Sequence, residues 1–304
     1  MRTILLAHGV LGFSKIGATP YFNGVEQCWA PDAAGNPPRF LRPAVAPAGS
    51  IEARAKTLQA TIEGALSADE LARGKIVHIV AHSMGGLDAR YLISPAGLGR
   101  AKWVASLTTL STPHRGSALA DIVTGRRFLS VSDLVHLAGA VSHDTLASIL
   151  RSLGKAPASG PLGLVTPLAL FDALRDIGHY IHNLFGTPPS AFEELTTEFV
   201  SAFTEGHNDL QGVPFLCFAG QSGPHATMCR ELYAPWLVLR AISGDNDGAV
   251  AVSSSSLGSN VRTIPADHFE EVGLADFFDG LPPMKHYPLC DVYRQIDAWQ
   301  RSIG

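Results

Sequence analysis

The segment "HIVAHSMGG", residues 78–86, places a serine between small residues directly after an apolar run. A strand, a sharp turn and a helix in this order form a nucleophile elbow, which strains the serine backbone so that its hydroxyl projects above the sheet edge. Ala81 and Gly85 lie two positions before and after Ser83, where the tight turn would make larger side chains clash. Ala81 replaces the first glycine of the familiar G-x-S-x-G pattern. A serine that begins a helix is the simpler alternative, so the interpretation needs further residues.

A serine hydroxyl is a poor nucleophile until an imidazole accepts its proton, so an acid and a histidine must accompany Ser83. Where this elbow is used, they follow the serine in the order acid and then histidine, each on a loop after a strand. The candidate acids are Asp245, Asp247 and Asp267, and the candidate histidines are His225, His268 and His286.

One acid and one histidine fit both the order and the local chemistry. Asp247 and Gly248 lie in the turn-forming cluster "SGDNDGAV", which follows an apolar segment and can aim a carboxylate across a sheet edge. His268 lies in "IPADHFEEVG", directly after the apolar run "NVRTIP". His225 precedes the acid, and His286 lies among prolines beside the last helical pattern.

Among the acids, Asp267 is adjacent to His268, and adjacent side chains usually diverge. Asp245 stays a rival to Asp247. The simpler alternative for Asp247 is a turn residue whose carboxylate only caps its own backbone. The predicted catalytic residues are therefore Ser83, Asp247 and His268.

When an activated serine attacks a carbonyl carbon, negative charge develops on the carbonyl oxygen, and backbone N–H groups are needed to stabilise it. One donor is expected to be the amide of Met84, directly after the nucleophile, and the other the amide of Val10 in "AHGVLGF", residues 7–13. His8 precedes the serine, and we expect it to order this loop rather than to act as the base.

Five short apolar runs predict the strands of a sheet covered on both faces, because their apolar residues are continuous rather than alternating. The runs are 3–8, 75–82, 103–111, 213–220 and 260–265. Helical patterns cover 51–65 behind the candidate N-cap Ser50, 84–94 before Pro95, and 289–303. Strands and helices alternate, which predicts the α/β class with a mostly parallel sheet.

The segment from about 115 to 208 has helical patterns and little strand signal. We interpret 115–208 as a helical cap or lid inserted within a single domain of 1–304. Residues 156–171 are apolar and rich in proline and glycine, which indicates a part of the lid that faces substrate. An ordinary helical layer with one irregular loop is the alternative.

The composition excludes several classes of protein. The 304 residues are 46% hydrophobic, and 23 Lys+Arg against 27 Asp+Glu give a net charge of −4 without a basic cluster, which argues against a nucleic-acid partner. No apolar run has the length of a transmembrane helix. The first residues lack the apolar core and cleavage site of a signal peptide, and the compartment and the oligomeric state stay open.

The four cysteines, Cys28, Cys217, Cys229 and Cys290, lack the close spacing of a zinc site. Buried thiols are the expected state. One disulfide is the alternative for an exported protein, and Cys217 and Cys229 are the nearest pair in sequence.

Seven motifs in order resemble the bacterial family I triacylglycerol lipases of the Pseudomonas and Proteus type. They are "LLAHGVLGF", "YFNGV", "AHSMGGLDARY", "TLSTPHRGSALAD", "NDGAVAVSSSSLG", "DHFEEVG" and "VYRQIDAWQ", and they span nearly the whole chain except the cap. The form "AHSMGG" is also similar to that of the small lidless lipases of Bacillus, although this chain is far longer.

The resemblance implies an α/β-hydrolase fold with Ser83 as nucleophile, His268 as base and Asp247 as the acid that orients it. It implies that the amides of Val10 and Met84 form the oxyanion hole. It also implies a helical lid over a hydrophobic cleft that opens in transient contact with a lipid surface, and it suggests a secreted protein.

Members of this family bind a structural calcium ion near the catalytic histidine. Of the three family ligands, the first position falls here around Ser222 to His225 without a carboxylate, the second is Glu270, and a glutamine position is Leu274. Calcium prefers six or more oxygen ligands that include several carboxylates. Glu270 alone cannot supply them, so we expect no calcium and no other cofactor.

The sequence therefore predicts a serine hydrolase for carboxylic esters, most closely a triacylglycerol lipase with a small-molecule ester or lipid as substrate. A carboxylesterase or polyester hydrolase on shorter or soluble esters would use the same residues. A non-catalytic binding protein with the α/β-hydrolase fold is the alternative from another class.

Overall fold

The computed structural model describes residues 2–10, 15–16, 19–128, 130, 133, 189–223, 228–274 and 287–303. The helical patterns over 134–188, including 156–171, lie outside the described residues, as do His225 and His286. The division into one domain of 1–304 with a cap at 115–208 therefore stays a prediction.

Six parallel strands form the central sheet, in the order β4-β1-β5-β6-β7-β8. Their bounds are Thr3–Ala7 (β1), Arg39–Leu41 (β4), Val77–His82 (β5), Val104–Leu110 (β6), Phe215–Gly220 (β7) and Val261–Ile264 (β8). All five predicted strands are present, and the predicted α/β class with a parallel sheet is confirmed. Lys15–Ile16 (β2) and Thr19–Pro20 (β3) form a separate antiparallel pair.

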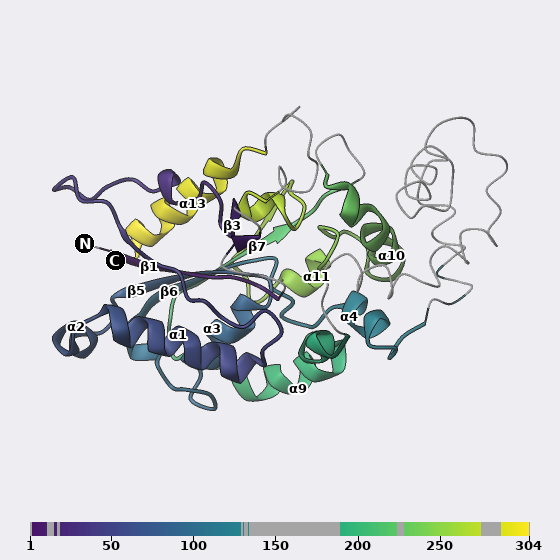
Figure 1. Cartoon of the computed structure of the whole chain (residues 1–304), viewed down its shortest axis with the longest axis horizontal. Helices are drawn as coiled ribbons and strands as arrows, with labels where there is room; N and C mark the ends of the chain where they lie inside the picture. The colour runs from purple at the N-terminus through teal and green to yellow at the C-terminus, as the bar shows by residue number, and fades with distance from the viewer. Residues whose placement is uncertain are drawn as a thin grey trace.

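Helices cover both faces of the sheet (Figure 1). Ile51–Ala65 (α1) and Gly85–Ile93 (α3) lie on one side, and Leu289–Ser302 (α13) lies on the other. All three are predicted helices, and α1 begins as expected, with Ser50 accepting a hydrogen bond from the amide of Ala53.

The shorter helices were not all anticipated by periodicity. They are Ala68–Arg73 (α2), Ala118–Val123 (α4), Thr197–His207 (α9), Tyr233–Ser243 (α10) and Val252–Ser255 (α11). The 3-10 helices are Glu26–Cys28 (η1), Ala101–Trp103 (η2), Pro189–Leu195 (η3), Arg230–Leu232 (η4) and Glu270–Val272 (η5).

The central strands bury both of their faces. In β1, Ile4 and Leu6 belong to a core that includes Tyr293 of α13. Leu5 belongs to a second core that includes Leu58 of α1. This two-sided burial explains why the strand sequences are continuous apolar runs.

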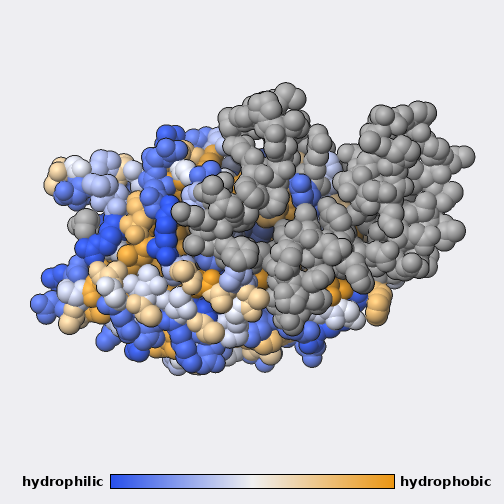
Figure 2. All heavy atoms as spheres, viewed as in Figure 1, coloured by the Kyte–Doolittle hydropathy of each residue, from blue (hydrophilic) through white to orange (hydrophobic). Residues whose placement is uncertain are grey.

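In Figure 2, polar residues are prominent at the lower left of the molecule, where α1 and α2 lie in Figure 1, and they are mixed with apolar residues there. Within the described ranges, no helix combines the length and the apolar composition needed to cross a membrane.

A disulfide joins Cys28 and Cys290, which are 262 residues apart in sequence. It links the end of η1 to the beginning of α13. The expectation of four buried thiols is therefore wrong for this pair, whereas Cys217 and Cys229 are buried free thiols and are not joined to each other.

Candidate active site

Ser83 lies at the sharp turn between β5 and α3, with a backbone φ of 55°. A residue with a Cβ atom adopts this left-handed conformation only at an energetic cost. The turn is held from both sides, because the Ser83 amide donates to the carbonyl of Leu110 (2.9 Å) and the Gly86 amide donates to the carbonyl of Ser83 (3.1 Å). The serine thus has the strained backbone of a nucleophile elbow.

Gly85 and Gly86, the two residues after Met84, leave no room for a side chain. A Cβ atom at Gly85 would lie 2.3 Å from the carbonyl oxygen of Ala7, and one at Gly86 would lie 2.1 Å from Oγ1 of Thr112. Both positions therefore require glycine for α3 to begin directly against β1 and the loop after β6.

The loop after β1 approaches the serine closely, since a Cβ atom at Gly9 would lie 2.6 Å from Cβ of Ser83. Arg54 holds this loop from behind: its Nη2 donates to the carbonyl of His8 (2.5 Å), and its Nε donates to Oδ2 of Asp88 (2.9 Å). Arg54 and Asp88 are fully buried. Burial lowers the pKa of His8 to about 4, so this histidine is neutral at pH 7.

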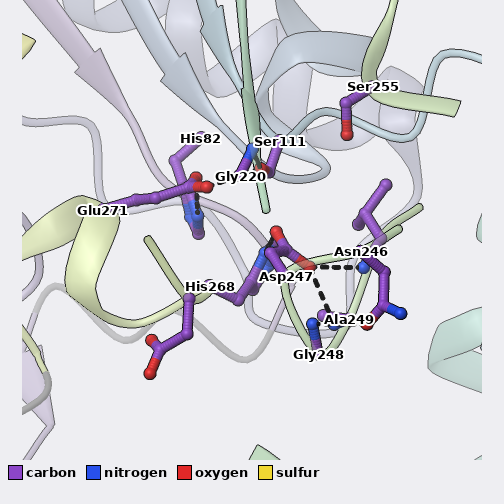
Figure 3. A network of polar contacts seen from close by, with 12 residues as sticks. His82, Ser111, Gly220, Asn246, Asp247, Gly248, Ala249, Ser255, His268 and Glu271 are labelled. Carbon is purple, nitrogen blue, oxygen red and sulfur yellow. Dashed lines mark hydrogen bonds and ion pairs between the residues drawn. The ribbon is translucent and has the colours of Figure 1, made fainter. Parts of the chain in front are cut away.

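His268 and Asp247 form a hydrogen-bonded pair, with 2.7 Å between Nδ1 and Oδ2. The His268 amide also donates to the carbonyl of Asp247 (3.0 Å). Oδ1 of Asp247 accepts the amides of Ala249 (2.8 Å) and Val250 (2.7 Å), as Figure 3 shows around the labelled carboxylate. Asp247 is fully buried and His268 is 8% exposed, so the hydrogen bond between them is largely shielded from bulk water.

The structure does not bring the rival acids to His268. Asp245 forms an ion pair with Arg240. Asp267 turns Oδ1 to the amides of Phe269 and Glu270, at 2.8 Å each. The described contacts therefore associate His268 with Asp247.

Ser83 and His268 come to the same edge of the sheet. Ser83 follows β5, Asp247 lies between β7 and β8, and His268 follows β8. The ring of His82, next to the serine, lies 4.3 Å from the ring of His268 between centroids. Over the described ranges, no hydrogen bond joins Oγ of Ser83 to His268, so the complete triad stays a prediction.

The two predicted oxyanion donors lie on either side of the serine. Met84 follows Ser83 directly, and Val10 follows Gly9 in the loop after β1. Within the part of the chain that the structure describes, neither amide donates to a backbone carbonyl.

The sequence did not predict a buried polar cluster that lies close to His268. Glu271 accepts a hydrogen bond from the hydroxyl of Ser111 (2.6 Å), and it faces His82, which in turn is hydrogen-bonded to the hydroxyl of Tyr21 (2.6 Å). Burial lowers the pKa of His82 well below its ordinary value, and burial together with the negative charge of Asp247 raises the pKa of Glu271. The signal in the sequence was weak, since Glu271 only shares the loop "DHFEEVG" with the histidine.

The described residues at the family's calcium position do not fit calcium. Leu274 is fully buried among apolar residues, and Oε2 of Glu270 accepts the amide of Asp267 (2.8 Å). Asp267 links the loop that carries His268 directly to the segment at Cys229, because its Oδ2 accepts a hydrogen bond from the amide of Cys229 (2.7 Å).

Among the described residues, one group of potential metal ligands comes together. Atoms of His82, His268 and Glu271 lie within 4.8 Å of one another. Nδ1 of His268 is bonded to Asp247, and Nδ1 of His82 is bonded to Tyr21.

The chain is similar in sequence to several bacterial proteins. No protein-family model matches it. A triacylglycerol lipase of Vibrio cholerae is 28% identical over 279 residues, which are 88% of this chain and 78% of that protein. A triacylglycerol lipase of Pseudarthrobacter phenanthrenivorans is 30% identical over 220 residues, which are 64% of this chain and 66% of that protein.

Solved structures share the fold. The mature form of the Bacillus licheniformis lipase BlEst2 has a TM-score of 0.57 at 19% identity, covering 88% of this chain and 85% of that one. The metagenomic carboxyl esterase MGS0156 has a TM-score of 0.62 at 13% identity, covering 99% of this chain and 76% of that one. At these identities the likeness concerns the arrangement of strands and helices alone.

Proposed function

This chain belongs to the bacterial lipases of the α/β-hydrolase superfamily, and we propose that it is a serine hydrolase that cleaves carboxylic esters, with triacylglycerols as substrates. One observation carries the proposal: a strained serine follows β5, and His268, which is paired with Asp247 at 2.7 Å, follows β8 at the same edge of the parallel sheet. The relatives named triacylglycerol lipases support the choice of substrate.

In the proposed reaction, His268 accepts the proton of the Ser83 hydroxyl while its oxygen attacks the ester carbonyl carbon. The tetrahedral intermediate collapses as His268, now protonated and oriented by Asp247, donates the proton to the leaving alcohol. Water then attacks the acyl-enzyme, His268 accepts its proton, and the carboxylic acid leaves as Ser83 recovers its hydrogen.

We assign the oxyanion hole to the amides of Val10 and Met84. The close approach of Gly9 to Ser83 supports the assignment, because it brings the loop that carries Val10 beside the nucleophile. The buried Arg54 supports it further, since it fixes the carbonyl of His8 and hence the path of the loop. Donors that are fixed before the reaction need no reorganisation as the charge develops.

We further propose that the helical segment 115–208 covers the site and that the protein contacts a lipid surface transiently during turnover. The family resemblance supports both statements. Of the described elements, α4 and α9 lie within this segment.

The nucleophile is tested by labelling with a fluorophosphonate probe, which reacts with activated serines. We expect the intact protein to be labelled, Ser83→Ala to be unlabelled, and Ser201→Ala, a change on the exposed face of α9, to be labelled normally. An intact, folded protein that is not labelled would instead favour a non-catalytic binding protein with this fold.

The substrate class is tested with p-nitrophenyl esters of increasing acyl length and with emulsified triolein. A triacylglycerol lipase hydrolyses the long-chain esters and the emulsion. Labelling of Ser83 with activity only on short or soluble esters would make the protein a carboxylesterase or polyester hydrolase.

We also propose that hydrolysis needs no calcium, because a hydrogen bond from the amide of Cys229 to Asp267 already holds the loop that carries His268. We expect the same ester hydrolysis rate and the same thermal midpoint with EDTA or with added calcium chloride. A midpoint that rises with calcium would reveal a calcium site and refute this part of the proposal.

A further inference from the structure

Two buried polar atoms beside the proposed catalytic residues have no hydrogen-bond partner within the described part of the chain. They are Nε2 of His82 and Oε2 of Glu271. Both side chains are 0% exposed, and Figure 3 shows the carboxyl group of Glu271 beside His82. A buried polar atom without a partner costs free energy, so a ligand that binds both atoms would be stabilised at this position.

The separation of these two atoms suits a shared metal ion. Nε2 of His82 lies 3.3 Å from Oε2 of Glu271. Zinc binds imidazole nitrogen and carboxylate oxygen at roughly 2.0–2.2 Å in a tetrahedral arrangement, which places two such ligand atoms about 3.3–3.6 Å apart. The two atoms are therefore spaced as neighbouring ligands of one tetrahedral ion.

The imidazole of His268 can supply a third ligand. One of its ring nitrogens lies within 4.8 Å of the ligand atoms of His82 and Glu271, and the His82 and His268 rings are 4.3 Å apart between centroids. A small movement of the His268 side chain brings this nitrogen to the spacing of a ligand. Two imidazoles and one carboxylate are a known ligand set of zinc sites in which water takes the fourth position.

Two of the three ligand side chains are held in place from their far sides. Nδ1 of His82 is 2.6 Å from the hydroxyl of Tyr21, and Oε1 of Glu271 accepts a hydrogen bond from the hydroxyl of Ser111 (2.6 Å). When Nδ1–H of His82 donates to Tyr21, Nε2 carries the lone pair that a metal ion needs. Such outer contacts are typical of metal ligands, because they fix the orientation of each side chain.

The surroundings favour a cation of the zinc type. Asp247, which is bonded to His268, and Asp267 and Glu270, which lie within two residues of it in sequence, are further buried carboxyl groups. A divalent ion offsets the repulsion among carboxylates that lie close together. Imidazole nitrogen suits zinc, whereas calcium and magnesium prefer oxygen ligands.

We propose that His82, Glu271 and His268 together bind one zinc ion, and that the bound ion inhibits the protein reversibly. The inhibition rests on the function proposed above, in which Nε2 of His268 accepts the proton of Ser83 while Nδ1 stays bonded to Asp247. A metal ion on either ring nitrogen removes the imidazole from this reaction. Zinc is therefore an inhibitor and not a cofactor.

The first test measures zinc binding to Ser83→Ala, which lacks the nucleophile and keeps all three ligands. After removal of metals with EDTA and dialysis, we expect isothermal titration with zinc chloride to show one ion per chain, and the thermal midpoint to rise with the zinc concentration. Magnesium chloride should give neither effect. Absence of zinc binding would overturn the proposal.

Two ligand variants in the Ser83→Ala background locate the ion. Glu271→Gln keeps an acceptor for the hydroxyl of Ser111 but offers zinc a neutral amide, and His82→Gln removes an imidazole. We expect each to weaken zinc binding by about 100-fold or more, since loss of a hydrogen bond that only supports a ligand already costs roughly 10–100-fold. The matched control Glu63→Gln, at an exposed position of α1, should bind zinc like its parent. Unchanged zinc affinity in either ligand variant, shown to be folded by circular dichroism, would overturn the proposal.

Inhibition is tested with the intact protein and a soluble p-nitrophenyl ester. We expect hydrolysis to be lost as zinc fills the site and to be restored by EDTA, and fluorophosphonate labelling of Ser83 to fall in parallel. Zinc that binds these ligands without lowering the rate would refute the inhibitory role. Zinc binding in a protein that cleaves no ester would refute the proposed function alone, whereas an active hydrolase that binds no zinc would refute the metal site alone.

Discussion

Replacing Gly9 with alanine tests how closely the loop after β1 must approach the nucleophile. The added Cβ atom would lie 2.6 Å from Cβ and 3.0 Å from Oγ of Ser83, whereas ordinary contacts begin at 3.4 Å. The strained backbone of the elbow fixes the position of Cβ of Ser83, and Arg54 holds the loop after β1 from the other side. The two segments must therefore move apart by about 0.8 Å to relieve the closest contact.

The size of this displacement sets the expected effect. A misplacement of about 1 Å between reacting groups and their donors costs roughly 100-fold in rate, so we expect kcat/KM of Gly9→Ala to fall by about 100-fold, mainly through kcat. Overpacking at a tight contact also costs about 1–3 kcal/mol in the free energy of unfolding.

Both quantities are measured with a soluble p-nitrophenyl ester and by urea unfolding. Gly64→Ala is the matched control, because no atom lies within 4 Å of a Cβ at this position of α1, and alanine stabilises a helix by about 1 kcal/mol relative to glycine. Wild-type activity together with a wild-type urea midpoint in Gly9→Ala would refute the inferred contact between the loop and the serine.

Two further predictions concern stability. Ser83→Gly should have a free energy of unfolding about 1 kcal/mol higher than that of Ser83→Ala, because a φ of 55° strains a residue that has a Cβ atom; equal urea midpoints for the two variants would contradict a strained elbow. Burial lowers the pKa of His78 from 6.5 to about 4, so between these pH values the unfolded chain binds a proton at this residue that the folded protein does not bind, and stability falls as the pH falls. Between pH 7 and pH 5, His78→Gln should therefore lose about 2 kcal/mol less stability than wild type in urea unfolding. Equal losses would mean that the pKa of His78 is the same in the folded protein as in the unfolded chain.

The parts of the fold that the sequence predicts correctly have local signals. The runs that form β5 and β7 are apolar on both faces because helices cover both sides of the sheet. Ser50 predicts the beginning of α1 correctly, because its side chain accepts a hydrogen bond from the amide of Ala53. Once parallel strands are inferred, the segments that follow them must meet at one edge, so chain order together with the turn residues around Asp247 favoured Asp247 and His268 and left Asp245 as a rival.

Other features depend on contacts that no local pattern contains. The strand β4 is three residues long and exists through its pairing with β1. Cys28 and Cys290 are joined only because η1 and α13 lie together in the folded chain. Glu271 lies beside His82 only because the folded chain brings the end of β5 next to the loop that carries His268.

The bond between Cys28 and Cys290 also makes most of the polypeptide a covalent ring. A protease that cuts once anywhere inside this ring produces no free fragment, because the two pieces stay attached through sulfur. Outside the ring, Arg2, directly before β1, pairs with Asp297 of α13 at 2.6 Å, which links the segments on either side of the disulfide. A nicked molecule would therefore keep its parts together until a reductant opens the ring.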